Sequence, residues 1–329
     1  MTVIPRRQFL IAAGALLASP VAGNAQRHER VYRIGSLSAN PTPSPLRVFM
    51  VDRLRELGWI EQRNLVFENR YTGGDREKIA AGARELVALR VDLIITGGGA
   101  ETPQAAMEAT KSIPIVFLIA DDPVRLGLVR NLARPEGNIT GLSTMNADLD
   151  AKRLQLLKEV LPALKRVGVM WSPIDPSGAL VMVLVESAAR ALGVALEPLP
   201  IQRPGSDLDE AFAAAKQRAV EAVMILGTPV LFGHASRIGE LASSTGIPTI
   251  SAWSLVTEAG GLLSYGTNLK ILNRRLAEIV DRILKGAKPG VIPVERPTKF
   301  DLEINIKSAK TLGIKVPQSL LSRADRLIE

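Results

Sequence analysis

The chain has 329 residues, 47% hydrophobic and 22% charged, a balance typical of a soluble globular protein with two domains rather than one core. Its formal net charge of +8 comes from basic residues scattered along the sequence, without the dense Lys/Arg runs of a nucleic-acid-binding protein. There is no cysteine, which excludes disulfides, a thiolate nucleophile and a lipidated cysteine anchor.

The first 25 residues have the organisation of an export signal. Arg6 and Arg7 precede an apolar run over 10–18, and a small-x-small site follows at 23–25. The run is shorter than the ~20 residues that span a bilayer, so we favour a cleaved signal over an uncleaved anchor. Paired arginines before x-Phe-Leu are typical of twin-arginine export, although Pro5 stands where Ser or Thr is usual. We therefore expect a periplasmic protein cleaved after Ala25.

From residue 33 onward, short β-rich runs alternate with helical patterns. Because the units repeat as β-α-β, they predict a parallel sheet covered by helices on both faces. Strands are predicted at 34–37, 65–71, 91–96 and 113–119, and helices at 46–57, 76–89 and 101–110.

The same order of elements recurs at an offset of 130–135 residues, which predicts a second lobe built like the first. Strands at 167–170, 223–227 and 247–250 correspond to three strands of the first half, and Gly193 corresponds to Gly58. A helix over 268–285, a Pro-containing link and a strand near 300–304 then follow, as expected of a chain that recrosses between lobes. The expected division is an export signal over 1–25, lobe 1 over 26–141 plus about 267–297, and lobe 2 over 142–266 plus about 298–329.

Open α/β sheets bind ligands outside the carboxyl ends of their strands, which nominates particular loops. These loops are 36–40, 97–102 and 121–123 in the first lobe, and 172–177, 227–229 and 251–254 in the second. The candidate ligand-binding residues in or near them are Ser38, Gly98, Gly99, Thr102, Asp122, Asp175, Thr228, Trp253 and Glu258.

The glycine run at 97–99 is the sharpest local feature. Glycines before a helix let backbone N–H groups approach an anion such as a carboxylate, with the Thr102 hydroxyl as a further donor. A tight strand-to-helix turn without a ligand is the alternative. Asp122 could hold a ligand ammonium or start a turn with Pro123.

Aromatic and acidic residues of the second lobe have two interpretations each. Trp171 and Trp253 follow strands and could stack on a ring or simply pack at the rim of a cleft. Glu258 lies beside two glycines, which favours a role at a helix end or hinge before one in ligand contact.

Motifs of catalysis and of cofactor binding do not occur. The chain has two histidines, His28 and His234, and no Gly-x-Ser-x-Gly elbow for either to serve. The glycine run lacks a Gly-Lys-Ser/Thr ending and dinucleotide spacing, and no cluster has metal-ligand spacing. We therefore expect no enzyme activity, no cofactor and no metal.

Three long stretches carry a resemblance to a known family. They are 122–124 with 131–141, then 258–266, and then 283–289 with 297–300, which resemble the ABC transporter substrate-binding family commonly assigned to tryptophan/tyrosine uptake. The resemblance covers essentially the whole chain, although Glu136 stands where the family usually has Gly and Asp121 where a small polar residue is common. It implies a type I periplasmic binding fold, which is α/β with two similar doubly wound parallel-sheet lobes joined by a multi-strand hinge.

The resemblance also implies what the protein does. We expect a monomeric periplasmic binding protein that captures a small molecule, such as an aromatic or other amino acid, and delivers it to an ABC permease and its ATPase. An exported ligand sensor that signals to a receptor, and an α/β hydrolase with a non-standard site, are the alternatives. The sequence does not name the solute.

Overall fold

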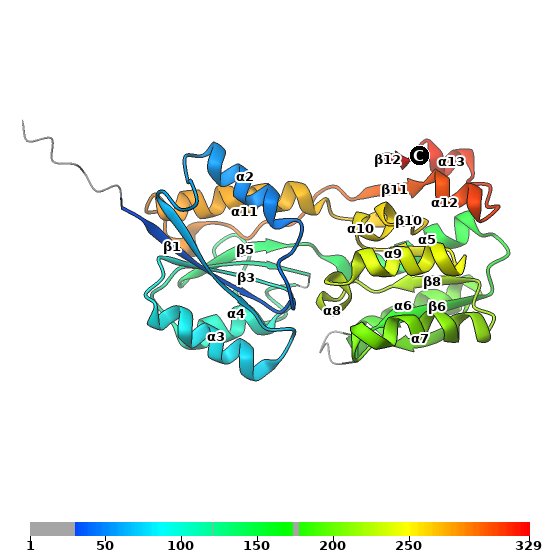
Figure 1. Cartoon of the computed structure of the whole chain (residues 1–329), viewed down its shortest axis with the longest axis horizontal. Helices are drawn as coiled ribbons and strands as arrows, with labels where there is room; N and C mark the ends of the chain where they lie inside the picture. The colour runs from blue at the N-terminus through cyan, green and yellow to red at the C-terminus, as the bar shows by residue number, and fades with distance from the viewer. Residues whose placement is uncertain (1–29, 121, 174–177) are drawn as a thin grey trace, which may run out of the picture. The chain divides into compact units, whose positions relative to one another are not determined.

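The computed structural model describes residues 30–120, 122–173 and 178–329, which fold into two β-sheets with helices on their faces (Figure 1). The predicted export signal, Asp121 and Asp175 lie outside the described residues. Among the described residues, no helix is both long enough and apolar enough to cross a membrane.

The first sheet has five parallel strands in the order β2-β1-β3-β4-β5. Strands β3, β4 and β5 are buried along almost their whole length, as expected when helices cover both faces of a parallel sheet. The elements are β1 (Tyr32–Ser38), α2 (Arg47–Glu56), β2 (Leu65–Tyr71), α3 (Arg76–Ala88), β3 (Leu93–Gly97), α4 (Glu101–Ala109), β4 (Ile115–Ile119), β5 (Ile139–Ser143) and, from much later in the chain, α11 (Leu269–Leu284).

The second sheet has seven strands in the order β12-β11-β10-β9-β8-β6-β7, and its one antiparallel pair is β10 with β11. Its strands are β6 (Arg166–Trp171), β7 (Ala195–Pro200), β8 (Ala222–Ile225), β9 (Thr249–Ser251), β10 (Leu263–Gly266), β11 (Asp301–Asn305) and β12 (Arg326–Ile328). Its helices are α5 (Asp150–Val160), α6 (Gly178–Leu192), α7 (Pro204–Gln217), α8 (Pro229–Phe232), α9 (Ala235–Thr245), α10 (Ser254–Glu258), α12 (Ile306–Thr311) and α13 (Gln318–Leu321).

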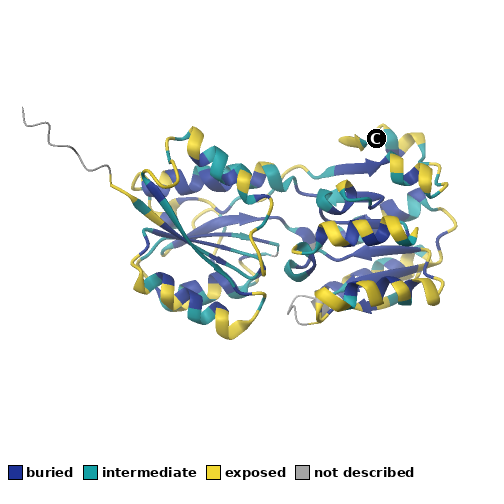
Figure 2. Cartoon of the chain, in the orientation of Figure 1, coloured by how far each residue is buried: buried dark blue, intermediate teal, exposed yellow. Residues whose placement is uncertain are grey.

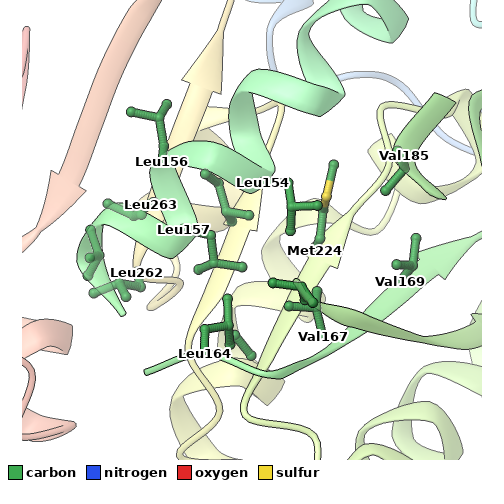
Figure 3. Close-up of a cluster of buried hydrophobic side chains, with 14 of the residues drawn as sticks. Leu154, Leu156, Leu157, Leu164, Val167, Val169, Val185, Met224, Leu262 and Leu263 are labelled. Carbon is green, nitrogen blue, oxygen red and sulfur yellow. The ribbon is translucent and has the colours of Figure 1, made fainter. Parts of the chain in front are cut away.

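Helices lie on both faces of each sheet, so each sheet has two apolar cores. On the first sheet, α2 and α11 cover one core while α3 and α4 cover the other (Figure 1). The helices turn their exposed residues outward while the strands between them stay buried (Figure 2). On the second sheet, Figure 3 shows Leu154 and Leu157 of α5 directed at Met224 and Val167 of the strands beneath. Burying such aliphatic side chains stabilises the fold by roughly 1.5–3 kcal/mol each.

The predicted fold class is confirmed: the protein is α/β with two helix-covered, largely parallel sheets. Strands β5, β7, β10 and β12 were not predicted, because polar residues, Gly or Pro interrupt their apolar runs, as Gly141 does in β5 and Pro198 in β7.

The chain passes three times between the two sheets. It leaves β5 for the short 3-10 helix η1 (Asn146–Leu149), returns after β10 to α11, and crosses again from the 3-10 helix η2 (Pro289–Val291) to β11. Backbone hydrogen bonds join two of these segments, from Ser143 N to Glu295 O at 3.0 Å and from Glu295 N to Gly141 O at 3.1 Å. The Thr267 hydroxyl donates to Thr144 O at 3.0 Å and ties in the third.

Candidate functional site

A cavity of about 170 Å³ lies at the carboxyl ends of strands from both sheets. One water molecule needs only about 15 Å³ on the same measure, so the cavity has room for a small solute. The residues lining it that bear on recognition are Ser38, Asn40, Arg47, Met50, Thr96, Gly98, Gly99, Thr144, Gly227, Thr228, Phe232, Trp253, Leu269, Asn273 and Leu276.

The glycine loop between β3 and α4 forms part of this wall. Gly98 and Gly99 have φ angles of +81° and +111°, in the left-handed region that favours glycine. No side chain caps the start of α4, where Ala100 occupies the N-cap position. Gly97, Gly98 and Gly99 line the cavity, so this part of its wall is backbone without side chains. Glu101 in the first turn of α4 stabilises the helix start but opposes an anion close to it.

Thr102 holds this loop from behind instead of lining the cavity. Its side chain is fully buried, and its hydroxyl lies 3.3 Å from Gly97 O and 3.4 Å from Gly99 O. A hydroxyl has one proton to donate, and it is used within the loop. The carbonyl oxygens of Gly97 and Gly99 therefore compete with a ligand for the proton that Thr102 was predicted to donate.

Several buried polar side-chain atoms around the cavity have no hydrogen-bond partner among the described residues. The uncharged ones are Asn40 Oδ1 and the hydroxyl oxygens of Thr96, Thr144 and Thr228. Leaving a buried polar group unpaired costs about 1–3 kcal/mol, so such groups are uncommon and call for an explanation. Other such atoms, among them Asn69 Oδ1 and Ser172 Oγ, belong to residues away from the cavity, but these four belong to residues that line it. Small side-chain rotations would let a bound solute supply their partners.

The apolar part of the wall comes from both sheets. Trp253 follows β9, is 4% exposed and packs edge-on against Phe232, with 5.4 Å between ring centroids. On the other side, Met50 of α2 and Leu276 of α11 contribute aliphatic surface. A ring-bearing solute would find both aromatic and aliphatic neighbours here.

Arg47, the first residue of α2, is the one charged side chain among the described residues that line the cavity. Its guanidinium carbon lies 4.3 Å from the centroid of the Phe67 ring, a cation–π contact. Its Nη2 lies 3.8 Å from Glu61 Oε1, which is an ion pair but too long for a hydrogen bond.

The structure brings five of the predicted residues to the same cavity, and their contact with a solute stays a prediction. These are Ser38, Gly98, Gly99, Thr228 and Trp253. Ser38 Oγ also accepts a hydrogen bond from Asn40 N at 3.1 Å, which shapes the loop after β1.

Asp122 is not among the residues that line this cavity. Its Oδ1 accepts from Val124 N at 2.8 Å and from Arg125 N at 3.3 Å, and its Oδ2 lies 3.4 Å from Arg296 Nη2. The two bonds of Oδ1 are those of a turn, which was the alternative interpretation of this residue, and Oδ2 forms a long-range ion pair.

Glu258 likewise stands apart from the cavity, in an ion-pair cluster beside β11. Its Oε1 lies 3.1 Å from Lys270 Nζ and 2.5 Å from Arg326 Nη1. Burial disfavours the charged form of Glu258, but hydrogen bonds from Arg326 and Lys270 outweigh burial and lower the pKa of this carboxyl. The structure thus places Glu258 at a helix end, the first of its two predicted roles.

Sequence reasoning missed Arg47, Thr96, Thr144 and the residues of α11. Thr96 could have been predicted, because it immediately precedes the glycine run at the carboxyl end of a strand. Arg47 and the α11 residues carried no signal, because the carboxyl-end rule considers loops and they lie on helices.

Among the described residues, no group of three or more His, Asp or Glu side chains could hold a metal ion. Burial lowers the pKa of His234, which sits at the start of α9 and does not line the cavity.

Comparisons with known proteins agree with this architecture. The sequence model of the family described as ABC transporter substrate binding protein matches residues 47–328. Proteins of this family bind a small-molecule ligand and work with an ABC permease, and they are solute-binding proteins rather than enzymes, typically extracytoplasmic.

Two of the similar proteins are described by the amino acid that they bind. A protein of Clostridioides difficile called tyrosine-binding protein is 23% identical over 323 residues, covering 93% of this chain and 92% of its own. A Streptococcus pneumoniae ABC domain in complex with L-Trp is 25% identical, with a TM-score of 0.77, over 91% of this chain and all of that one. A conserved domain protein from Vibrio cholerae is 27% identical, with a TM-score of 0.78, over 91% of this chain and 99% of that one.

Proposed function

Because the chain belongs to the family of ABC transporter substrate-binding proteins, we propose that it is the solute-binding component of an ABC importer. In this proposal it captures an aromatic amino acid or a close relative in the cavity between the two sheets and delivers the solute to a permease and its ATPase. Binding is non-covalent, and the protein acts as a monomer.

The unpaired polar atoms carry this proposal. Asn40 Oδ1 and the hydroxyl oxygens of Thr96, Thr144 and Thr228 are buried around one cavity without partners among the described residues. A solute with donor groups would pair them, which converts a cost of the free protein into binding energy. Trp253 and Phe232 would pack against the apolar part of the solute. The printed ligands of the two relatives, tyrosine and L-Trp, have both kinds of group.

Thermal unfolding with a panel of amino acids tests the proposal. A ligand at 100 times its Kd adds about 2.7 kcal/mol to the free energy of unfolding, so a true solute raises the melting temperature by several degrees. We expect tryptophan, tyrosine or phenylalanine to give the largest shift, with glycine and alanine as matched controls without a ring. Equal shifts for all amino acids, or none for any, would contradict the proposed solute class.

Export to the periplasm is part of the same proposal, since an importer collects its solute there. We expect the exported protein to begin at Gln26, after cleavage at the small-residue site, which N-terminal sequencing of periplasmic protein checks. Replacing Arg6 and Arg7 together by lysine should block export by the twin-arginine route. Undiminished export of that double variant would point to the general secretory route instead.

A further inference from the structure

Arg47 has two nitrogen atoms that are buried and lack a hydrogen-bond partner among the described residues, Nε and Nη2. The whole side chain is 26% exposed, so the guanidinium is partly open while these two atoms are shielded from water. A buried donor on a charged group costs more when unpaired than a neutral one does. Arg47 lines the cavity, so a small movement of its side chain would bring these two atoms to acceptors on a bound solute.

Nε and Nη2 form the edge of a guanidinium that can donate one hydrogen bond to each oxygen of a carboxylate, a side-on arrangement. The same edge is occupied elsewhere in this chain, where Arg275 Nε lies 2.8 Å from Glu295 Oε2 and Arg275 Nη2 lies 2.7 Å from Glu295 Oε1. Such paired, charge-assisted bonds fix the direction of the carboxylate as well as its charge. In Arg47 neither atom of this edge makes a hydrogen bond among the described residues, and the only carboxylate paired with it there, Glu61, lies 3.8 Å from Nη2.

A negatively charged side chain is missing from the described part of the cavity wall. None of the described residues that line the cavity is acidic, so none of them provides a carboxylate for a ligand ammonium. Glu101 follows the glycine loop and its Oε2 lies against Gly99, but it does not line the cavity. Among the described residues of the wall, a solute carboxylate can therefore pair with the charged guanidinium of Arg47, whereas a solute ammonium can pair only with uncharged groups.

We propose that Arg47 is the specificity-determining residue of the site, binding the solute carboxylate side-on, and that the site takes ring-bearing carboxylic acids whether or not they carry an α-ammonium. This inference rests on the proposed function and deepens it. The preferred class is then arylalkanoic acids, of which aromatic amino acids are the aminated members.

Three probes with one ring system separate the two charges. L-tryptophan has a carboxylate and an ammonium, indole-3-propionate has only the carboxylate, and tryptamine has only the ammonium. Calorimetry on the unmodified protein should give Kd values within about tenfold of each other for the first two. Tryptamine, which cannot pair with Arg47, should bind roughly 10- to 150-fold more weakly, as expected for lost hydrogen bonds to a charged group.

Variants at Arg47 identify the residue responsible. Arg47→Gln should weaken both acids by the same roughly 10- to 150-fold and leave tryptamine unchanged. Arg47→Lys keeps the charge but not the fork, so it should recover only part of the loss. Arg55→Gln is the matched control, since Arg55 lies on the same helix, is exposed and pairs with Asp52. Circular dichroism and the melting temperature show whether each variant is folded.

The outcomes distinguish this inference from the function on which it rests. If tryptophan binds but indole-3-propionate is more than 100-fold weaker, the site needs the ammonium and the inference is wrong while the proposed function stands. Loss of tryptophan binding in Glu101→Gln would then identify the ammonium partner. Unchanged acid binding in folded Arg47→Gln would also overturn the inference. If none of the three probes binds the unmodified protein, the proposed solute class and this inference fail together.

Discussion

Buried threonines in this protein divide into those whose hydroxyl is paired and those whose hydroxyl is not. Thr140 Oγ1 donates to Ile292 O at 2.7 Å, whereas Thr228 Oγ1 on the cavity wall has no partner among the described residues. We expect Thr228→Val, which keeps the shape and removes the hydroxyl, to leave the melting temperature of the free protein unchanged or slightly higher. The same variant should bind its solute more weakly, because one hydrogen bond of about 0.5–1.5 kcal/mol is lost. Calorimetry and thermal unfolding check the two effects separately.

Thr140→Val is the matched control for this prediction. It removes the same atom from a buried threonine, but it leaves the carbonyl of Ile292 unpaired and should lower the free energy of unfolding by about 1–3 kcal/mol. Solute affinity should not change, since Thr140 does not line the cavity. The reverse pattern, with Thr228→Val destabilised and still binding normally, would show that the Thr228 hydroxyl is structural.

At the scale of elements, α2 and α11 are joined by an apolar contact and by a row of ion pairs above it. Glu56 of α2 accepts from Arg274 of α11 at 3.0 and 2.7 Å and from Arg53 at 2.9 Å. The hydrogen bonds from Arg274 and Arg53 lower the pKa of Glu56 from 4.5 to about 2. This contact stabilises the helix pair only while Glu56 is ionised.

The pH dependence of stability follows from that lowered pKa. Because the folded value lies below the unfolded one, the contribution is complete above about pH 4.5 and is lost as the pH falls toward about 2. We expect Glu56→Gln to lower the melting temperature at pH 7 and to differ less and less from the unmodified protein over that window. High salt should shrink the difference, since the pair is at the surface. Glu210→Gln on the exposed face of α7 is the control, and a pH-independent difference would contradict the assignment.

At the scale of the whole molecule, the three segments that pass between the sheets determine how one sheet can move relative to the other. Arg153 is fully buried beside them, donating to Tyr265 O at 2.7 Å, to Asn146 O at 2.9 Å and to the carboxylate of Asp150. This network ties the segment after β5 to the end of strand β10. Any movement of one sheet relative to the other must therefore bend the chain close to Arg153. Three parallel connections permit bending of one sheet unit against the other and restrict other motions.

We therefore expect binding to draw the two sheet units together, since the solute contacts both walls of the cavity. Small-angle scattering should show a smaller radius of gyration with a solute verified by calorimetry than without it. A radius that does not change on confirmed binding would contradict closure, unless the free protein already populates the closed state. The Thr228→Val variant at subsaturating solute should show a proportionally smaller change.

Much of this protein could be predicted from its sequence, because the relevant information is local. Alternating strand and helix patterns indicated parallel sheets, and the structure has them. The rule that ligands meet the carboxyl ends of strands led to Ser38, Gly98 and Thr228, which line one cavity. The first result depends on the periodicity of apolar residues and the second on the direction of each strand, and both can be read from residues adjacent in the sequence.

Only the tertiary structure decided which polar groups are left over for a solute. Asp122 and Thr102 matched the chemistry of a ligand contact, but nearby backbone groups take up their hydrogen bonds. Arg47 and Leu276 had no such signal, yet the packing of α2 against α11 sets both into the cavity wall. The backbone partners of Thr102 and Asp122 lie within five residues of them, whereas the cavity wall that contains Arg47 and Thr228 joins residues far apart in the sequence. Only folding brings those distant residues together.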